Sequence, residues 1–103
     1  GMTKRGRKAA KAEKKPTYYT DPLDRRFVLI ALKRGEDVEV FDEDAYEKFR
    51  GEGRYGVILD YSETIDGSTR AVNYVCISTY GLFLERHIFV NGEEKELQIY
   101  KEA

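Results

Sequence analysis

Residues 55–100 read YGVILDYSETIDGSTRAVNYVCISTYGLFLERHIFVNGEEKELQIY, four runs of strand-forming residues separated by turn signals. Asp66-Gly67 separates the first two runs and Asn91-Gly92 the last two. These dipeptides suit tight hairpin turns, because their residues readily adopt positive φ. The pattern predicts an antiparallel meander of about four strands, broken in the middle at Gly81. The expected strands are Tyr55–Ser62, Thr69–Thr79, Leu82–Val90 and Lys95–Tyr100.

One face of this sheet is expected to form the core, since alternate residues of a strand point to the same side. The candidate core residues are Val57, Leu59, Val75, Ile77, Leu82, Leu84, Ile88, Val90, Leu97 and Ile99. Ile58 and Phe89 interrupt the alternation, so the pattern leaves the facing of their strands open.

The stretch before the sheet carries apolar residues at helical spacing, namely Leu23, Phe27, Ile30 and Ala31. Asp21 and Pro22 are typical of a helix start, and residues 33–35 (Lys-Arg-Gly) are typical of a helix end. We therefore expect a helix over residues 22–34. The alternative is a buried strand over Phe27–Lys33, because a short apolar run fits either structure.

Two further elements are expected between this stretch and the meander. Residues 38–41 predict a short strand, and Asp42 is a suitable N-cap for a helix over residues 43–50 that ends at Gly51. Together these patterns predict an α+β fold in which one or two helices and a short strand precede the meander. We expect residues 18–103 to form a single domain.

Composition excludes several classes of protein. The chain has 103 residues, which suits one domain. Its longest apolar run, Phe27–Leu32, is far shorter than the roughly 20 residues that span a bilayer. We expect no membrane segment and a cytoplasmic location. Gly1 precedes Met2 and is interpreted as a residue left by expression.

Charge is distributed very unevenly along the chain. Residues 1–15 carry seven cations against Glu13 alone, a net charge of +6, whereas the remainder carries 11 cationic and 18 anionic side chains, a net charge of −7. Residues 1–17 also lack aromatic and large aliphatic side chains other than Met2, so we expect a disordered basic tail. Its expected nucleic-acid-binding residues are Lys4, Arg5, Arg7, Lys8, Lys11, Lys14 and Lys15.

Within the tail, Lys4-Arg5-Gly6-Arg7-Lys8 resembles the Arg-Gly-Arg core of the AT-hook. The resemblance covers four or five residues, and Lys8 stands where that motif has proline. It implies that both guanidinium groups enter a narrow minor groove. The alternative is that the tail only makes the chain more soluble.

Residues 51–56 (Gly-Glu-Gly-Arg-Tyr-Gly) match the spacing G-x-G-x-x-G. In dinucleotide-binding proteins this motif follows a strand and opens a helix. Here the glycines follow an expected helix and lead into a strand. We interpret them as a helix cap and connector and expect no cofactor.

Side chains for metal or acid–base chemistry are scarce. His87 and Cys76 are the only residues of their types, and a cross-strand contact between them is the only pairing they could make. We expect Cys76 to be a small core residue and His87 to lie on a polar strand face. The carboxylates fall at an expected helix start and a hairpin end, so we expect no catalytic pair and no metal site.

Aromatic residues on a sheet can stack on unpaired bases, and several of the eight tyrosines are expected on strands: Tyr55, Tyr61, Tyr74, Tyr80 and Tyr100. A structural role for these tyrosines is favoured, because tyrosine is common in strands and because the body of the chain, residues 16–103, is anionic. A local basic patch of Arg25, Arg26, Arg54 and Arg70 remains open.

The sequence thus favours a non-catalytic accessory module. Its acidic body would contact a protein partner, while the tail tethers it to nucleic acid. A second hypothesis is a protein-interaction module without nucleic acid, whose tail docks on its own body or on an acidic partner. A third is a small enzyme or ligand-binding protein, which requires a pocket beside Gly51–Gly56 or His87.

Overall fold

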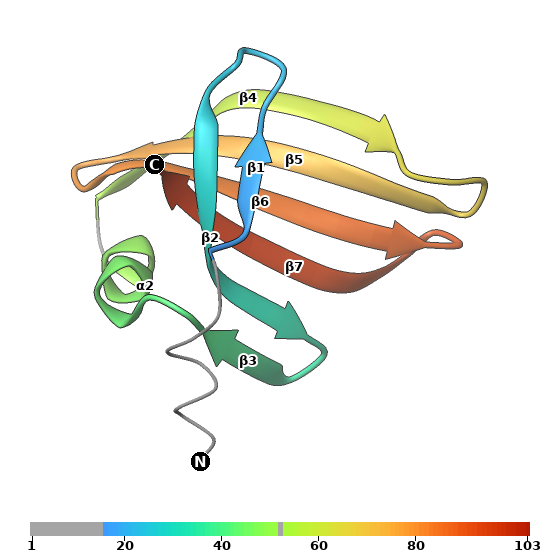
Figure 1. Ribbon diagram of the computed structural model, residues 1–103, viewed down its shortest axis with the longest axis horizontal. Coiled ribbons are helices and arrows are strands. Elements are labelled where there is room, and N and C mark those ends of the chain that lie inside the picture. Colours follow the sequence, from blue (N-terminus) through green and yellow to red (C-terminus); the bar gives the residue numbers. More distant parts are fainter. Residues whose placement is uncertain (1–15, 52) are drawn as a thin grey trace.

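The computed structural model describes residues 16–51 and 53–103, and for residues 54 and 57–60 it describes the backbone alone. Within these ranges the chain forms one helix and seven strands: β1 (Tyr18–Thr20), β2 (Arg26–Arg34), β3 (Asp37–Val40), α2 (Glu43–Arg50), β4 (Arg54–Thr64), β5 (Thr69–Ser78), β6 (Gly81–Val90) and β7 (Glu93–Glu102). The strands form one antiparallel sheet in the order β1-β2-β7-β6-β5-β4, with β3 also paired to β2 (Figure 1).

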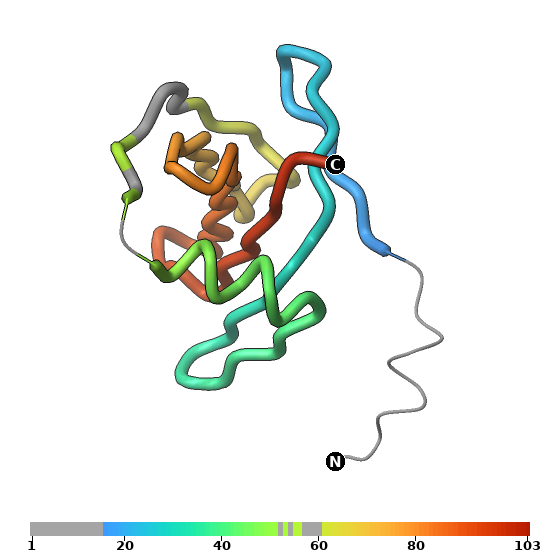
Figure 2. The backbone as a smooth tube through the Cα atoms, turned by 90° about the vertical axis from the view of Figure 1, so that its left-hand side faces the viewer, coloured from blue at the N-terminus to red at the C-terminus, as the bar shows by residue number. Residues whose placement is uncertain are grey.

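The sheet curls into a half-barrel, which brings its outermost strands, β1 and β4, toward each other (Figures 1 and 2). The hydroxyl oxygens of Tyr19 on β1 and Tyr61 on β4 are 3.1 Å apart. The Tyr19 hydroxyl also donates a hydrogen bond to the carboxylate of Glu63 on β4. Side-chain hydrogen bonds therefore bridge two strands that do not pair through their backbones.

The predicted meander is confirmed by β4 to β7, which pair in chain order. Asn91 and Gly92 have φ of 51° and 85°, as expected for their turn. Asp66 and Gly67 do not adopt positive φ. Instead the Asp66 carboxylate accepts hydrogen bonds from the backbone N–H groups of Ser68 and Thr69, both at 2.9 Å, and so closes a longer connection.

The helix predicted over residues 22–34 is wrong, and the alternative strand is correct. Asp21 does not cap a helix. Its carboxylate accepts hydrogen bonds from the backbone N–H groups of Leu23 (3.0 Å) and Arg25 (2.9 Å), and Asp24 has φ of 64°. This turn joins β1 to β2 in a hairpin. As a result β2 is an inner strand of the sheet, paired with β1 on one side and with β7 on the other.

The strand predicted over residues 38–41 and the helix predicted over 43–50 are confirmed by β3 and α2. The Asp42 carboxylate accepts a hydrogen bond from the Ala45 N–H at 3.0 Å, as an N-cap does. With a single short helix in the described ranges, the molecule is mostly β, and the α+β prediction overstated its helical part.

Two apolar clusters form the core, one on each face of the curled sheet. In the first, α2 packs Ala45 and Phe49 against the sheet, where Phe83 and Ile99 are buried. The second lies inside the curl and contains Phe27, Val75, Leu84 and Tyr100. Burial on both faces explains why strict alternation failed to identify the core.

Of the predicted core residues, Val75, Leu84 and Ile99 are buried, and Leu82, Ile88, Val90 and Leu97 are half-buried. Ile77 was predicted wrongly, since it is 40% exposed. The side chains of Val57 and Leu59 lie outside the described residues. A register shift between Ile88 and Phe89 explains the interrupted alternation there.

Candidate functional site

The seven cations predicted to bind nucleic acid all lie outside the described residues: Lys4, Arg5, Arg7, Lys8, Lys11, Lys14 and Lys15. The structure nevertheless describes where their segment joins the body. The Thr17 carbonyl accepts a hydrogen bond from the Leu29 N–H at 2.7 Å, and β1 begins at the next residue. The basic segment therefore meets the body at the β1 edge of the sheet.

An exposed arginine and tyrosine lie at this junction. The Arg26 guanidinium carbon is 3.8 Å from the centre of the Tyr18 ring, and the ring is 49% exposed. In the predicted basic patch, Arg25 instead forms an ion pair with Asp21 at 2.8 Å. Arg26 therefore stacks on an exposed aromatic ring close to where the basic segment joins the rest of the chain.

A strongly acidic stretch lies close to the same junction. Residues 36–47 contain seven carboxylates and no cation. The middle of this stretch is held against β2, because the Ile30 carbonyl accepts hydrogen bonds from the N–H groups of Phe41 (2.8 Å) and Asp42 (3.3 Å). Ile30 directly follows Leu29, whose N–H binds the Thr17 carbonyl. The basic segment before Thr17 and the acidic stretch over residues 36–47 are therefore held by neighbouring residues of β2.

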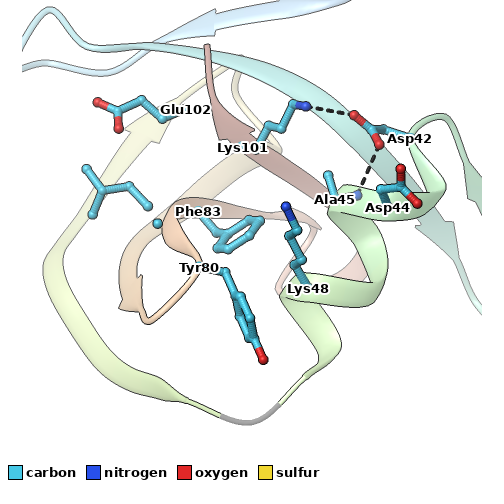
Figure 3. Close-up of a pocket in the computed structure, with 10 residues that line it drawn as sticks. Asp42, Asp44, Ala45, Lys48, Tyr80, Phe83, Lys101 and Glu102 are labelled. Atoms are coloured by element: carbon cyan, nitrogen blue, oxygen red, sulfur yellow. Dashed lines mark hydrogen bonds and ion pairs between the residues drawn. The ribbon is translucent and has the colours of Figure 1, made fainter.

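A cleft of about 440 Å³ opens between α2, the turn that joins β5 to β6, and the end of β7 (Figure 3). Its floor is apolar and includes Ala45, Leu82 and Phe83. The ring of Tyr80, which is 52% exposed, forms a wall. The remaining lining residues are Asp42, Asp44, Lys48, Gly81, Lys101 and Glu102.

The charged groups of the cleft differ in how they are paired. Lys101 donates a hydrogen bond to Asp42 at 2.7 Å. This bond and the one from the Ala45 N–H lower the pKa of Asp42. Figure 3 shows the Lys48 side chain alongside Phe83, with Asp44 and Glu102 on opposite sides of the opening. The cleft therefore offers a cationic donor and carboxylate acceptors around aromatic rings.

Comparison with protein-family models, curated proteins and solved structures finds no match. Function is therefore inferred from the geometry of the described residues.

The glycine-rich connector lies beside this cleft and serves the backbone. A Cβ added to Gly51 would lie 3.4 Å from the Tyr80 ring. Gly53 has φ of 102°, and a Cβ there would lie 2.5 Å from the Thr79 hydroxyl oxygen. The Thr79 N–H also donates to the Gly53 carbonyl at 3.1 Å. The glycines allow the chain to pass close to the turn that carries Tyr80, and they lead into β4 rather than into a helix.

Inside the curl, polar side chains form a hydrogen-bonded network across five strands. Arg86 donates to Glu63 at 3.3 Å and to Gln98 at 3.0 Å. The Tyr100 hydroxyl donates to Gln98 at 3.0 Å, and the Tyr19 hydroxyl donates to Glu63. The network therefore connects β7, β6, β4 and β1, and Asn73 adds a side chain from β5.

Asn73 is fully buried and donates a hydrogen bond to the Glu63 carboxylate at 3.0 Å. Burial opposes ionisation of Glu63, but hydrogen bonds from Tyr19 and Arg86 outweigh it and lower its pKa. Burial raises the pKa of Tyr19, as does its bond to Glu63. A carboxylate so fully engaged is suited to hold strands together rather than to transfer protons.

His87 lies on the opposite sheet face, between two carboxylates. Its Nε2 is 3.0 Å from Glu85 and its Nδ1 is 2.8 Å from Glu94. The Glu85 bond raises the pKa of His87, burial opposes this, and Glu94 raises it further. Cys76 pairs with Phe83 rather than with His87 and is buried, so the two do not meet.

Within residues 16–51 and 53–103, no cluster of three or more His, Cys, Asp or Glu residues could hold a metal ion. The one helix described there is too short to cross a membrane.

Sequence reasoning missed the cleft and the Tyr18–Arg26 pair. Tyr80 lies in the turn between β5 and β6, directly after the strand expected over Thr69–Thr79. Gly81, next to it, was the available signal, because a glycine with φ of 124° permits a tight turn that projects the preceding side chain. The contact between Tyr18 and Arg26 depends on the β1–β2 hairpin. A helix over residues 22–34 does not form that hairpin, so the sequence did not predict the contact.

Proposed function

We propose that this protein is a non-catalytic accessory module that holds nucleic acid through residues 4–15 and contacts a protein partner through its acidic body. The observation that carries the proposal is the separation of charge, +6 in residues 1–15 against −7 in the remainder. Cations in such a segment neutralise phosphates and give affinity with little sequence preference.

The geometry at the junction supports this proposal. Arg26 stacked on the exposed Tyr18 adds a cation and an aromatic ring to the body surface where the segment joins it. Arginine and aromatic side chains together are common in surfaces that bind nucleic acid. A bound strand could thus continue from the basic segment onto β1 and β2.

The alternative of a module without nucleic acid is supported by the acidic stretch over residues 36–47. The Ile30 carbonyl holds the middle of this stretch next to Leu29, the β2 residue whose N–H binds the Thr17 carbonyl. A basic segment attached there could fold back onto these carboxylates at high effective concentration.

Fluorescence anisotropy of labelled duplex DNA and single-stranded RNA tests the proposal. The whole chain is compared with a chain that starts at Pro16 and with a whole chain whose seven tail cations are replaced by glutamine. We expect only the unaltered chain to bind, with a log–log salt slope no steeper than about −6 for seven cations. Equal binding by all three proteins would contradict tethering by the tail, and binding by none would favour the alternative.

A further inference from the structure

The cleft beside α2 carries charges of both signs, which narrows the ligand that it fits. A simple anion would meet Asp44 and Glu102, and a simple cation would meet Lys48. A neutral, flat group that both donates and accepts hydrogen bonds suits all three charges and the aromatic wall. The volume of the cleft, about 440 Å³, lies in the range of small-molecule sites, roughly 300–1,000 Å³.

A nucleobase has this chemistry. Its face stacks on aromatic rings, its carbonyl and ring-nitrogen acceptors pair with lysine, and its exocyclic amines pair with carboxylates. Tyr80 provides a half-exposed ring, Phe83 lies at the floor, and the Lys48 side chain lies alongside Phe83 (Figure 3). Lys48 lies close enough to Asp42 to help lower its pKa, and its ammonium adds a hydrogen-bond donor to the lining of the cleft.

The sheet register places this cleft in line with the tail junction. Tyr18 pairs with Val28, Val28 with Lys101, and Lys101 with Phe83, so these four residues occupy one row on one sheet face. With strands spaced by about 4.8 Å, the row from Tyr18 to Phe83 spans about 14 Å. A short single strand that starts at the basic segment can therefore reach the cleft.

We infer that the cleft bounded by Lys48, Tyr80 and Phe83 receives an unpaired base of a single-stranded nucleic acid whose phosphates are held by residues 4–15. This inference rests on the proposed function, which supplies the phosphate contacts. It adds that the nucleic acid bound is single-stranded. Bases in a duplex are stacked and paired, so only an unpaired base can enter the cleft.

The test compares single-stranded oligonucleotides with duplexes of equal length, using the full chain in anisotropy titrations. Tyr80→Leu removes the ring, and Tyr80→Phe is the matched control that keeps it. We expect Tyr80→Leu to weaken single-strand binding about tenfold, since stacking of one base contributes on that order, and to leave duplex binding unchanged. Tyr80→Phe should bind within about twofold of the unaltered chain. Equal losses for both nucleic acids, or no loss for either, overturn the inference.

A second measurement tests the cleft independently of the tail. Adenosine and cytidine 5′-monophosphates are titrated into the ¹⁵N-labelled full chain, with inorganic phosphate as the control. We expect the amide signals of Lys48, Tyr80 and Leu82 to shift with the nucleotides and not with phosphate. The same shifts without any oligonucleotide binding would support the cleft and contradict the tether. Oligonucleotide binding without these shifts would keep the tether and overturn the inference.

Discussion

At the residue scale, His87 gives the molecule a defined pH dependence. Glu85 and Glu94 raise its pKa above the ordinary value of about 6.5. The folded state therefore binds the proton more tightly than the unfolded state. The resulting stabilisation is complete below about pH 6.5 and is lost as pH rises through the folded pKa.

We expect an NMR titration of the imidazole to give a midpoint above about 6.5. The chain contains one histidine, so the signal needs no assignment. Glu94→Gln should move the midpoint down, and His87→Gln should flatten the dependence of unfolding free energy on pH between about 6.5 and 8. A midpoint at or below 6.5 in the unaltered chain would contradict the carboxylate contacts.

The hydrogen-bonded network inside the curl should contribute to stability, and substitution of Arg86 tests this. Arg86→Met removes the donor to Glu63 and Gln98 while keeping much of the side-chain volume. We expect the free energy of unfolding in urea to fall by about 1–3 kcal/mol, because a half-buried carboxylate loses a charged partner. The double variant Arg86→Met/Glu63→Gln should recover part of this loss. A double variant that loses the sum of both single effects would show that the two residues act independently.

At the element scale, the meander was predictable and β2 was not, for physical reasons that Asp21 shows. Asn91-Gly92 fixes a hairpin locally, whatever lies around it. Asp21-Pro22 is locally consistent both with a helix start and with a turn, and the choice depends on pairing with β7, which is distant in sequence. The cleft could not be predicted either, since α2, Tyr80 and Lys101 meet only in the folded sheet.

The turn at Asp21 is itself testable. Asp21→Ala leaves the N–H groups of Leu23 and Arg25 without their acceptor and breaks the buried end of the Arg25 ion pair. We expect this change to lower the free energy of unfolding by about 1–3 kcal/mol, measured by urea denaturation. Asp66→Ala removes the same kind of turn at an exposed hairpin and should cost clearly less. Equal costs would show that burial of Asp21 does not matter.

At the scale of the whole molecule, the anionic body affects how the basic segment binds phosphate. Carboxylates near the tail junction attract the segment and repel nucleic acid, so both effects reduce affinity. Glu43 and Glu47 on α2 lie just after Asp42, whose N–H is bound to the β2 carbonyl near the junction. Glu93 and Glu94 begin β7, eight and seven residues before Lys101, or roughly 25 Å along the strand.

This difference in position gives two double variants that each remove two carboxylates. We expect Glu43→Gln/Glu47→Gln to raise the affinity of the full chain for labelled single strands about two- to threefold at 50 mM salt, since each nearby charge contributes a few tenths of a kcal/mol in water. Glu93→Gln/Glu94→Gln should change it less, because its charges lie beyond a Debye length of about 14 Å at this salt. Both effects should vanish at 0.3 M salt. Equal increases would mean that net charge alone governs binding and that the place where the basic segment joins the body does not matter.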